Sequence, residues 1–275
     1  MSVVAISETL GSLGAQVGLE LAHATSLEFY DREILSKAAE EYNQGVTALE
    51  HVTEERPTFW ERWSDAGRRA AAFVEATIVN LAARGGVVLC GRGSAFYLRP
   101  VPHALRVRVT APEPVRARRV ARAQGVSDAA ALELVRRSDR ERAARVRAIH
   151  GVDWRDPGLY DLVLSTERLD PSDAAGILRE TLRLPRFQPT PVTLAVVEDL
   201  RLAARARAEL LRHPATEHLR LQVACAERVL TLRGRVHHAA LRALVEELVG
   251  EVPGVRAIRN EVVVLDERLR LVHGV

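Results

Sequence analysis

The residues best suited to chemistry lie in the first eighteen positions, where a short apolar run meets a glycine turn. Residues 3–7 (VVAIS) predict a strand, and the chain then turns through Gly11, Ser12 and Gly14 into a helical pattern. A strand, a turn and a helix in this order direct backbone N–H groups and a helix N-terminus at one point, which favours phosphate. We therefore expect Gly11, Ser12 and Gly14 to form a phosphate-binding loop.

The side chains of this loop depart from the phosphate-loop pattern G-x-x-x-x-G-K-[ST]. When the pattern is laid on the turn, Gly14 occupies the lysine position and Ala15 occupies the Ser/Thr position. The shape of the loop is thus compatible with phosphate, whereas the side chains that the pattern uses for catalysis are missing.

The basic residues are almost all arginine. Lys37 is the single lysine among 39 basic residues, so a cation that binds phosphate must be Lys37 or an arginine. Arginine suits this task because its planar guanidinium binds two phosphate oxygens at once. Arg92 follows an apolar run and lies between two glycines, at the kind of strand end where open α/β sheets bind ligands. We expect Arg92 to contact an anionic ligand; the alternative is that it caps a helix or pairs with an acid.

The elements that must position these residues alternate between strands and helices. This order predicts βαβ units, and hence a mainly parallel sheet with helices on both faces. The predicted strands cover residues 3–7, 27–30, 87–90, 105–109 and 161–165, and the predicted helices cover 15–24, 34–42, 64–84, 113–149 and 171–184.

A proline-rich segment ends this pattern. Residues 185–191 carry three prolines, which favours a semi-rigid linker between a domain at 1–184 and a second domain at 192–275. The second domain has an αββαβ pattern, formed by a helix at 192–212, strands at 219–223 and 229–235, a helix around 241–248 and a strand at 258–264.

Composition narrows the classes of partner and site. The net charge of +3 is mild, so we expect no nucleic-acid partner. Cys90 and Cys225 have neither metal-ligand nor disulfide spacing, and no metal site is predicted, since the adjacent His237 and His238 face different ways on a helix. Without a secretory signal, and with its longest apolar segment (70–83) too short to span a bilayer, the chain is expected in the cytoplasm.

Five short motifs in matching order give residues 3–184 a family resemblance. Together they resemble the prokaryotic cytidylate-kinase-like family, a branch of the P-loop nucleoside monophosphate kinases. The motifs are Ile6-Ser7 with Gly11-Ser12 and Gly14, residues 29–34 (FYDREI), residues 91–93 (GRG), Asp139-Arg140 with Arg142, and residues 151–163 with Trp154 and Tyr160.

The resemblance implies a function for several residues. It implies a three-layer P-loop fold, a phosphate loop at 7–15, acceptor-nucleotide binding by Asp31, Arg32 and Arg92, and a lid near 136–147. Its catalytic arginines would be Arg140 and Arg142, for which the alternative is a solvated helix face. ATP and Mg²⁺ are implied if the protein is active.

Two residues depart from the family pattern. Glu8 stands where the family has arginine, and Leu13 replaces a glycine. An acid beside a triphosphate repels it, and a leucine restricts the backbone where a positive φ can be needed. Efficient phosphoryl transfer is therefore in question.

The C-terminal segment resembles the BON domain over residues 192–265. The likeness rests on residues 229–236 (VLTLRGRV), Gly254-Val255, Ile258, Asn260 and Val262. BON domains are associated with phospholipid or ligand binding, but with no signal ahead of it we expect no strong membrane binding here. We expect this domain to mediate contacts with proteins or ligands, or self-association.

Two functional hypotheses follow. The first, implied by the resemblance, is ATP-dependent phosphorylation of a nucleoside monophosphate, with CMP or dCMP as the acceptor. The second is a catalytically degenerate nucleotide-binding sensor or adaptor that is read out through the BON-like domain. Arg92 and the lid arginines favour the first, and Glu8, Leu13 and the absent lysine favour the second.

Overall fold

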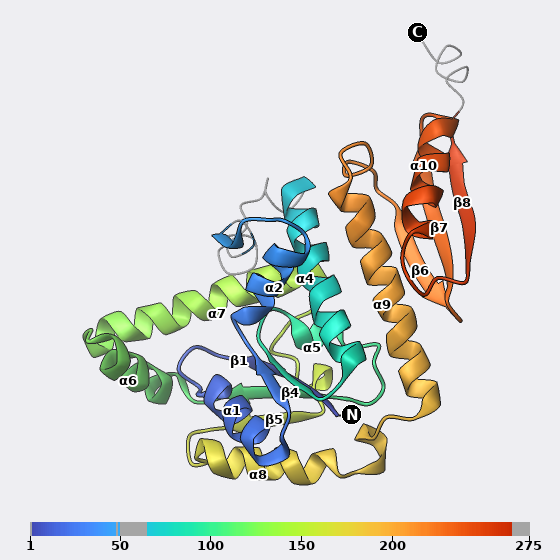
Figure 1. Cartoon of the computed structure of the whole chain (residues 1–275). Coiled ribbons are helices and arrows are strands. Elements are labelled where there is room, and N and C mark those ends of the chain that lie inside the picture. Colours follow the sequence, from blue (N-terminus) through green and yellow to red (C-terminus); the bar gives the residue numbers. More distant parts are fainter. Residues whose placement is uncertain (1, 48, 50–64, 266–275) are drawn as a thin grey trace.

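Five parallel strands form the central sheet of the N-terminal part of the chain (Figure 1). The computed structural model describes residues 2–47, 49 and 65–265. The strand order is β2-β3-β1-β4-β5, with β1 at the centre. The strands are β1 (Val3–Glu8), β2 (Glu28–Tyr30), β3 (Val87–Cys90), β4 (Ala104–Thr110) and β5 (Leu162–Ser165).

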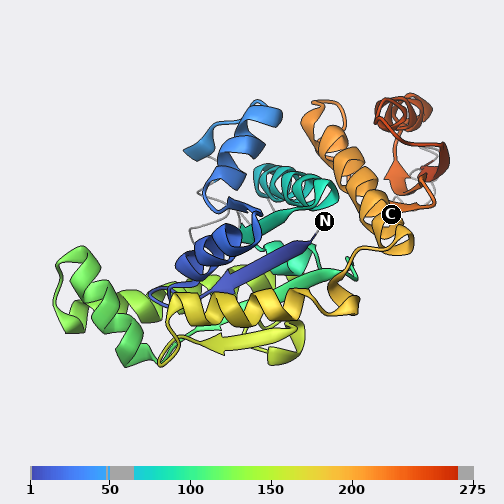
Figure 2. The same cartoon turned by 60° about the horizontal axis from the view of Figure 1, so that its bottom comes forward.

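Helices cover both faces of this sheet (Figure 2). Helices α1 (Gly14–Thr25) and α8 (Pro171–Leu182) pack on one face, where they meet Val4 and Ile6 of β1. The opposite face of β1 presents Val3 and Ala5 to a second core. The helices that contribute to that core include α2 (Glu33–Glu41), α4 (Asp65–Arg84) and the short α5 (Ser94–Tyr97). A strand buried on both faces reads as a continuous apolar run, and the predicted three-layer α/β fold is confirmed.

The predicted helix at 113–149 is two helices. Helix α6 (Glu113–Gln124) ends at Gly125, whose φ of +66° is left-handed, and α7 (Asp128–His150) begins after Ser127 accepts a hydrogen bond from the Ala130 N–H. The helical sequence is interrupted there because a left-handed glycine followed by a serine N-cap stops one helix and starts another. The α6–α7 hairpin projects from the sheet (Figure 1) and has a small apolar core of its own.

A second, three-stranded sheet lies toward the C-terminus. It has the order β6-β7-β8, in which β6 and β7 are antiparallel and β7 and β8 are parallel. The sequence predicts that the first strand begins at Leu219, but it begins at Gln222. The Leu219 N–H instead donates to the Thr216 carbonyl and closes a turn. The elements are β6 (Gln222–Ala226), β7 (Val229–Val236), α10 (Ala239–Gly250) and β8 (Ala257–Val264).

Helix α9 (Pro191–Arg212) contributes to two cores. Val197, Ala204 and Ala208 pack into the core of the large sheet domain, beside α4. Another stripe of α9, which includes Leu202 and Leu210, packs into the core of the small sheet (Figure 1). The segment before α9 is also ordered, with Phe187 only 7% exposed in the core beneath α8. The division of the chain at 185–191 stays a proposal, and a break there would separate α9 from one of its two partners.

Candidate functional site

A pocket of about 350 Å³ opens at the carboxyl ends of β1 and β3. Such a position follows from the parallel sheet, since the loops that leave neighbouring strands meet at one edge. Four segments line it: the end of β1, the turn after β2, the turn and helix after β3, and one face of α7. The lining polar residues include Ser7, Glu8, Asp31, Arg32, Arg92, Ser94, Ser138, Glu141, Arg142, Arg145 and His150.

The structure brings together the three predicted acceptor-binding residues and one of the two predicted catalytic arginines. Asp31, Arg32, Arg92 and Arg142 all line this pocket. Burial raises the pKa of the Asp31 carboxyl, and the charges of Arg92 and Arg32 oppose that rise. The charges of these groups therefore interact at the carboxyl end of the sheet.

Arg92 has a backbone conformation that is uncommon for a residue with a side chain. Its φ is +54°, between Gly91 at +73° and Gly93 at +78°. A Cβ on Gly93 would lie 3.0 Å from Nε2 of His150 and 3.3 Å from the Tyr97 ring, so a side chain would be crowded there. Left-handed backbone at a non-glycine residue costs free energy and is concentrated at functional sites. This turn directs the chain after β3 across the floor of the pocket.

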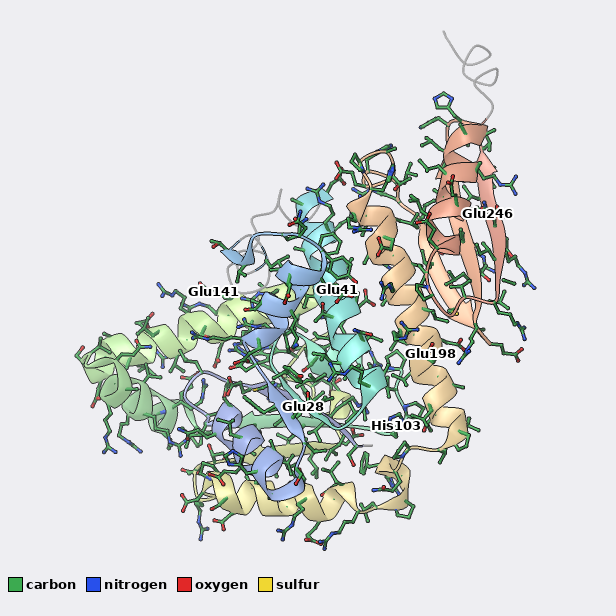
Figure 3. All side chains as sticks on the ribbon, in the orientation of Figure 1. Glu28, Glu41, His103, Glu141, Glu198 and Glu246 are labelled. Carbon is green, nitrogen blue, oxygen red and sulfur yellow. The ribbon has the colours of Figure 1, made fainter. Side chains whose placement is uncertain are left out.

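One face of α7 forms a wall of the pocket. Ser138, Glu141, Arg142, Arg145 and Ile149 follow the helical period and all line it. The structure places the predicted catalytic residue Arg140 elsewhere: its side chain is exposed and does not line the pocket. The labelled Glu141 marks this helix in Figure 3.

Aromatic side chains close the pocket floor. His150 lies at the end of α7 with its ring 5.0 Å from Phe96 and 4.7 Å from Tyr97, measured between centroids. Burial lowers the pKa of His150 to about 4, so the ring is neutral at pH 7. Trp154 is 2% exposed, and the Arg108 guanidinium stacks over it at 4.5 Å. The floor is therefore largely aromatic, with a neutral His150, whereas α7 contributes arginines to the wall.

Gly11, Ser12 and Gly14, the three residues of the predicted phosphate loop, do not line the pocket. A Cβ on Gly11 would lie 2.7 Å from the Arg116 carbonyl oxygen, so this glycine faces the neighbouring helix. The Ser12 N–H donates to the Thr9 carbonyl, and its hydroxyl is completely buried. The third residue, Gly14, begins α1.

The Glu8 carboxylate occupies the N-terminus of α1. Its Oε2 accepts a hydrogen bond from the Ala15 N–H at 3.0 Å, and the Gly14 N–H contributes a second one. Burial raises the pKa of the Glu8 carboxyl. The charge of Arg142 and the two backbone donors lower it and so partly offset the effect of burial. The carboxylate thus takes up the backbone donors that the sequence predicts for phosphate.

Three arginines hold the carbonyl oxygens of the loop from outside. Arg142 donates to Glu8 at 2.7 Å, Arg116 to Leu10 at 3.3 Å, and Arg119 to Gly11 at 3.2 Å. These contacts fix the path of the loop between β1 and α1. Sequence reasoning gave no role to Arg116 and Arg119.

Other residues of the site were also missed by sequence reasoning. Arg145 and Ser138 carry a readable signal, since they lie at helical spacing from Arg142 on the same face of α7. Nothing in the sequence around His150 or Tyr97 marks them as pocket residues, because they meet only through the packing of α5 against the end of α7.

Comparisons with known proteins agree with this architecture. The family model described as the cytidylate kinase-like family matches residues 3–168. A cytidylate kinase of Pyrobaculum calidifontis is 31% identical over 178 residues, which cover 64% of this chain and 90% of that protein. A cytidylate kinase of Methanopyrus kandleri is 29% identical over 189 residues, covering 66% and 92%.

The fold and the C-terminal part of the chain also resemble known proteins. An uncharacterized protein from Eubacterium ventriosum has a crystal structure similar to this one, with a TM-score of 0.53 at 18% identity, covering 66% of this chain and 98% of that one. That likeness shows the fold alone. The BON domain model matches residues 198–266. Because the first family model spans more than half of the chain, this protein belongs to the cytidylate kinase-like family.

Proposed function

We propose that this protein phosphorylates a nucleoside monophosphate, with CMP or dCMP as the acceptor. The observation that carries the proposal is the pocket at the ends of β1 and β3, where Arg32, Arg92, Arg142 and Arg145 surround about 350 Å³. This volume is within the range of small-molecule sites. The choice of CMP or dCMP is supported by the cytidylate kinases to which the chain is similar.

Phosphoryl transfer requires the protein to position two anions and to neutralise charge. In our proposal Arg92 and Arg32 bind the acceptor phosphate, since both follow the strand ends that form the pocket floor. Arg142 and Arg145 approach from α7 and stabilise the negative charge of the group in transfer. The neutral His150 and the aromatic floor exclude water beneath the acceptor.

The donor side fits ATP and Mg²⁺ poorly. The described residues offer no group of three or more His, Cys, Asp or Glu side chains that could hold a metal ion. Mg²⁺ in kinases is usually held by one or two carboxylates and by substrate phosphates, but the loop hydroxyl position holds Ala15 and the backbone donors bind Glu8. With Glu8 in this position the loop does not accept a triphosphate, and we assign no step to the metal.

Titration calorimetry with CMP and dCMP tests the acceptor site. Arg92→Ala should weaken binding of the preferred monophosphate by about 1.5–3 kcal/mol, the range for a hydrogen bond to a charged group. The matched control is Arg118→Ala, which removes an exposed arginine of α6 outside the pocket. Equal affinities for the two variants would contradict the assignment of Arg92.

A coupled assay for ADP release then tests transfer on the same samples. ADP release that requires both ATP and CMP would support the kinase function. CMP binding without ADP release would leave a nucleotide-binding protein and favour the second candidate.

The second candidate is a nucleotide sensor read out through the BON domain. A second cavity of about 590 Å³ lies between α4, α9 and the small sheet domain, and the two cavities share Phe96, Tyr97 and His150 as a common wall. Arg207 of α9 also forms an ion pair with Glu75 of α4 at 2.5 Å and donates to the Val223 carbonyl of β6. A movement of Phe96, Tyr97 or His150 on nucleotide binding would therefore change the cavity that α9 also lines.

Hydrogen exchange tests this second candidate. CMP at saturating concentration should slow amide exchange in α9 and β6 as well as around Arg92, because the wall is shared. Protection confined to the large sheet domain would rule out a readout through the BON domain.

Several expectations about location and partners stay predictions. In the part of the chain that the structure describes, no helix combines the length and the apolar character needed to cross a bilayer. The cytoplasmic location, the weak membrane binding and the absence of a nucleic-acid partner are proposals. Contacts or self-association through the BON domain belong to the same group.

A further inference from the structure

The donor end of the site has an unusual internal contact, between Glu8 at the end of β1 and the first turn of α1. The first turn of a helix carries N–H groups without partners in the helix, and these groups attract anions. Here the anion comes from the chain itself, since the Glu8 carboxylate accepts from the Ala15 N–H at 3.0 Å and from the Gly14 N–H. No side chain at the N-cap position, Leu13, caps the helix.

The glycine at the lysine position is a condition for this contact. A Cβ on Gly14 would lie 2.5 Å from the Glu8 Cβ and 2.7 Å from its Oε2, distances that real Cβ atoms do not show. Any side chain at position 14, including the lysine of the phosphate-loop pattern, is therefore incompatible with Glu8 in its present place. The contact with Cβ would arise with any residue except glycine at position 8, whereas the contact with Oε2 belongs to the bound carboxylate.

A second observation concerns the polar groups of the same loop. The Ser12 hydroxyl is 0% exposed and has no hydrogen-bond partner among the described residues. A buried hydroxyl without a partner costs free energy. The loop thus keeps a polar group without a hydrogen-bond partner while Glu8 is bound to the first turn of α1.

The backbone of Glu8 is held by an arginine of α7. Arg142, which lines the acceptor pocket, donates to the Glu8 carbonyl at 2.7 Å. Its charge also favours the ionised form of the Glu8 carboxyl. The same arginine therefore contacts both the acceptor pocket and the backbone of the residue that occupies the donor loop.

We propose that the Glu8 carboxylate is an internal occupant of the donor-phosphate site, so that a polyphosphate binds the loop only by displacing it. This inference rests on the proposed function, because it assigns the loop to the donor. The chemistry that competes with Glu8 is that of a di- or triphosphate chain, whether free or carried by a nucleoside.

The test compares the affinities of variants for ATP and for inorganic pyrophosphate, by calorimetry on the full chain. Glu8→Ala should bind both ligands at least tenfold more tightly than the wild type. The affinities of Glu8→Gln should lie between those of the wild type and Glu8→Ala, because its amide oxygen can still accept a hydrogen bond from the Ala15 N–H. The matched control is Glu141→Gln, which removes the same charge from the pocket wall. Its gain should be less than half that of Glu8→Ala on a logarithmic scale.

A second measurement tests the contact without any ligand. Gly14→Ala should lower the melting temperature of the wild type, since the new methyl group collides with the Cβ and the carboxylate of Glu8, and should lower it much less in a Glu8→Gly background, where both collisions are removed. An equal loss in both backgrounds would overturn the assigned packing of Glu8 on Gly14.

The outcomes separate this inference from the proposed function. A melting temperature that falls in Glu8→Ala with no gain for ATP or pyrophosphate would overturn the inference and leave Glu8 as a helix cap, even if CMP still binds. A gain for pyrophosphate in Glu8→Ala, with no CMP binding to any variant, would support the inference and refute the kinase proposal.

Discussion

The ion pair between Arg116 and Asp139 should be one of the most costly contacts to break in the large sheet domain. It joins α6 to α7 through two hydrogen bonds, of 2.8 and 3.2 Å, and the two side chains are only 4% and 12% exposed. Removing one partner of a buried pair leaves an uncompensated charge, which costs about 3–5 kcal/mol. We expect Asp139→Ala to lose this amount of stability.

The chain provides a matched control for this substitution. Arg136 and Glu113 join the same two helices across the same sequence separation of 23 residues, at 3.2 Å, but their side chains are 46% and 44% exposed. Exposed pairs contribute about 0–1 kcal/mol. Glu113→Ala should therefore cost at least 2 kcal/mol less than Asp139→Ala.

Urea denaturation followed by circular dichroism measures the difference, and hydrogen exchange in α6 and α7 shows whether the hairpin opens on its own. The double variant Arg116→Met with Asp139→Leu should recover most of the loss, because the buried charges are then replaced by apolar groups. It should still loosen the loop, since Arg116 also donates to the Leu10 carbonyl. Equal costs for Asp139→Ala and Glu113→Ala would refute the reasoning from burial.

Burial lowers the pKa of His150 to about 4, so between pH 6.5 and 4 the unfolded chain binds more protons than the folded chain. The contribution of His150 to the free energy of unfolding should be complete above about pH 6.5 and fall by about 3 kcal/mol toward pH 4. The urea midpoint of His150→Phe should therefore depend less on pH than that of the wild type, and an equal dependence would contradict this. Arg142→Ala should lower the rate of CMP-dependent ADP release at least tenfold, whereas Arg140→Ala should leave it within about twofold, since only Arg142 lines the pocket; equal losses of rate would refute it. Glu75→Ala and Arg207→Ala should show a coupling of about 0.5–3 kcal/mol in a double-mutant cycle, because their side chains are 18% and 32% exposed at 2.5 Å; additive losses would exclude this contact.

The sequence by itself determined the fold of the large sheet domain. The buried strand β3 between glycines and the alternation of strands with helices are local patterns, since burial on both faces of a parallel sheet requires apolar residues at every position. The order of motifs also determined the family. The same local reasoning did not locate the break between two helices at Gly125, where a left-handed glycine ends the first, and it began a strand too early at Leu219, where the chain makes a turn.

Only the tertiary structure decided which predicted residues meet. The rotation of α7 against the sheet places Arg142 and Arg145 on the pocket and Arg140 in solvent, and that rotation depends on packing with distant segments. The sequence likewise shows that Glu8 lies beside the loop, but it does not show which groups the Glu8 carboxylate contacts. The carboxylate meets the Ala15 N–H because β1 and α1 are packed on the same sheet and the loop between them is held by arginines from α6 and α7. A hydrogen bond between residues seven positions apart thus depends on contacts more than a hundred positions away.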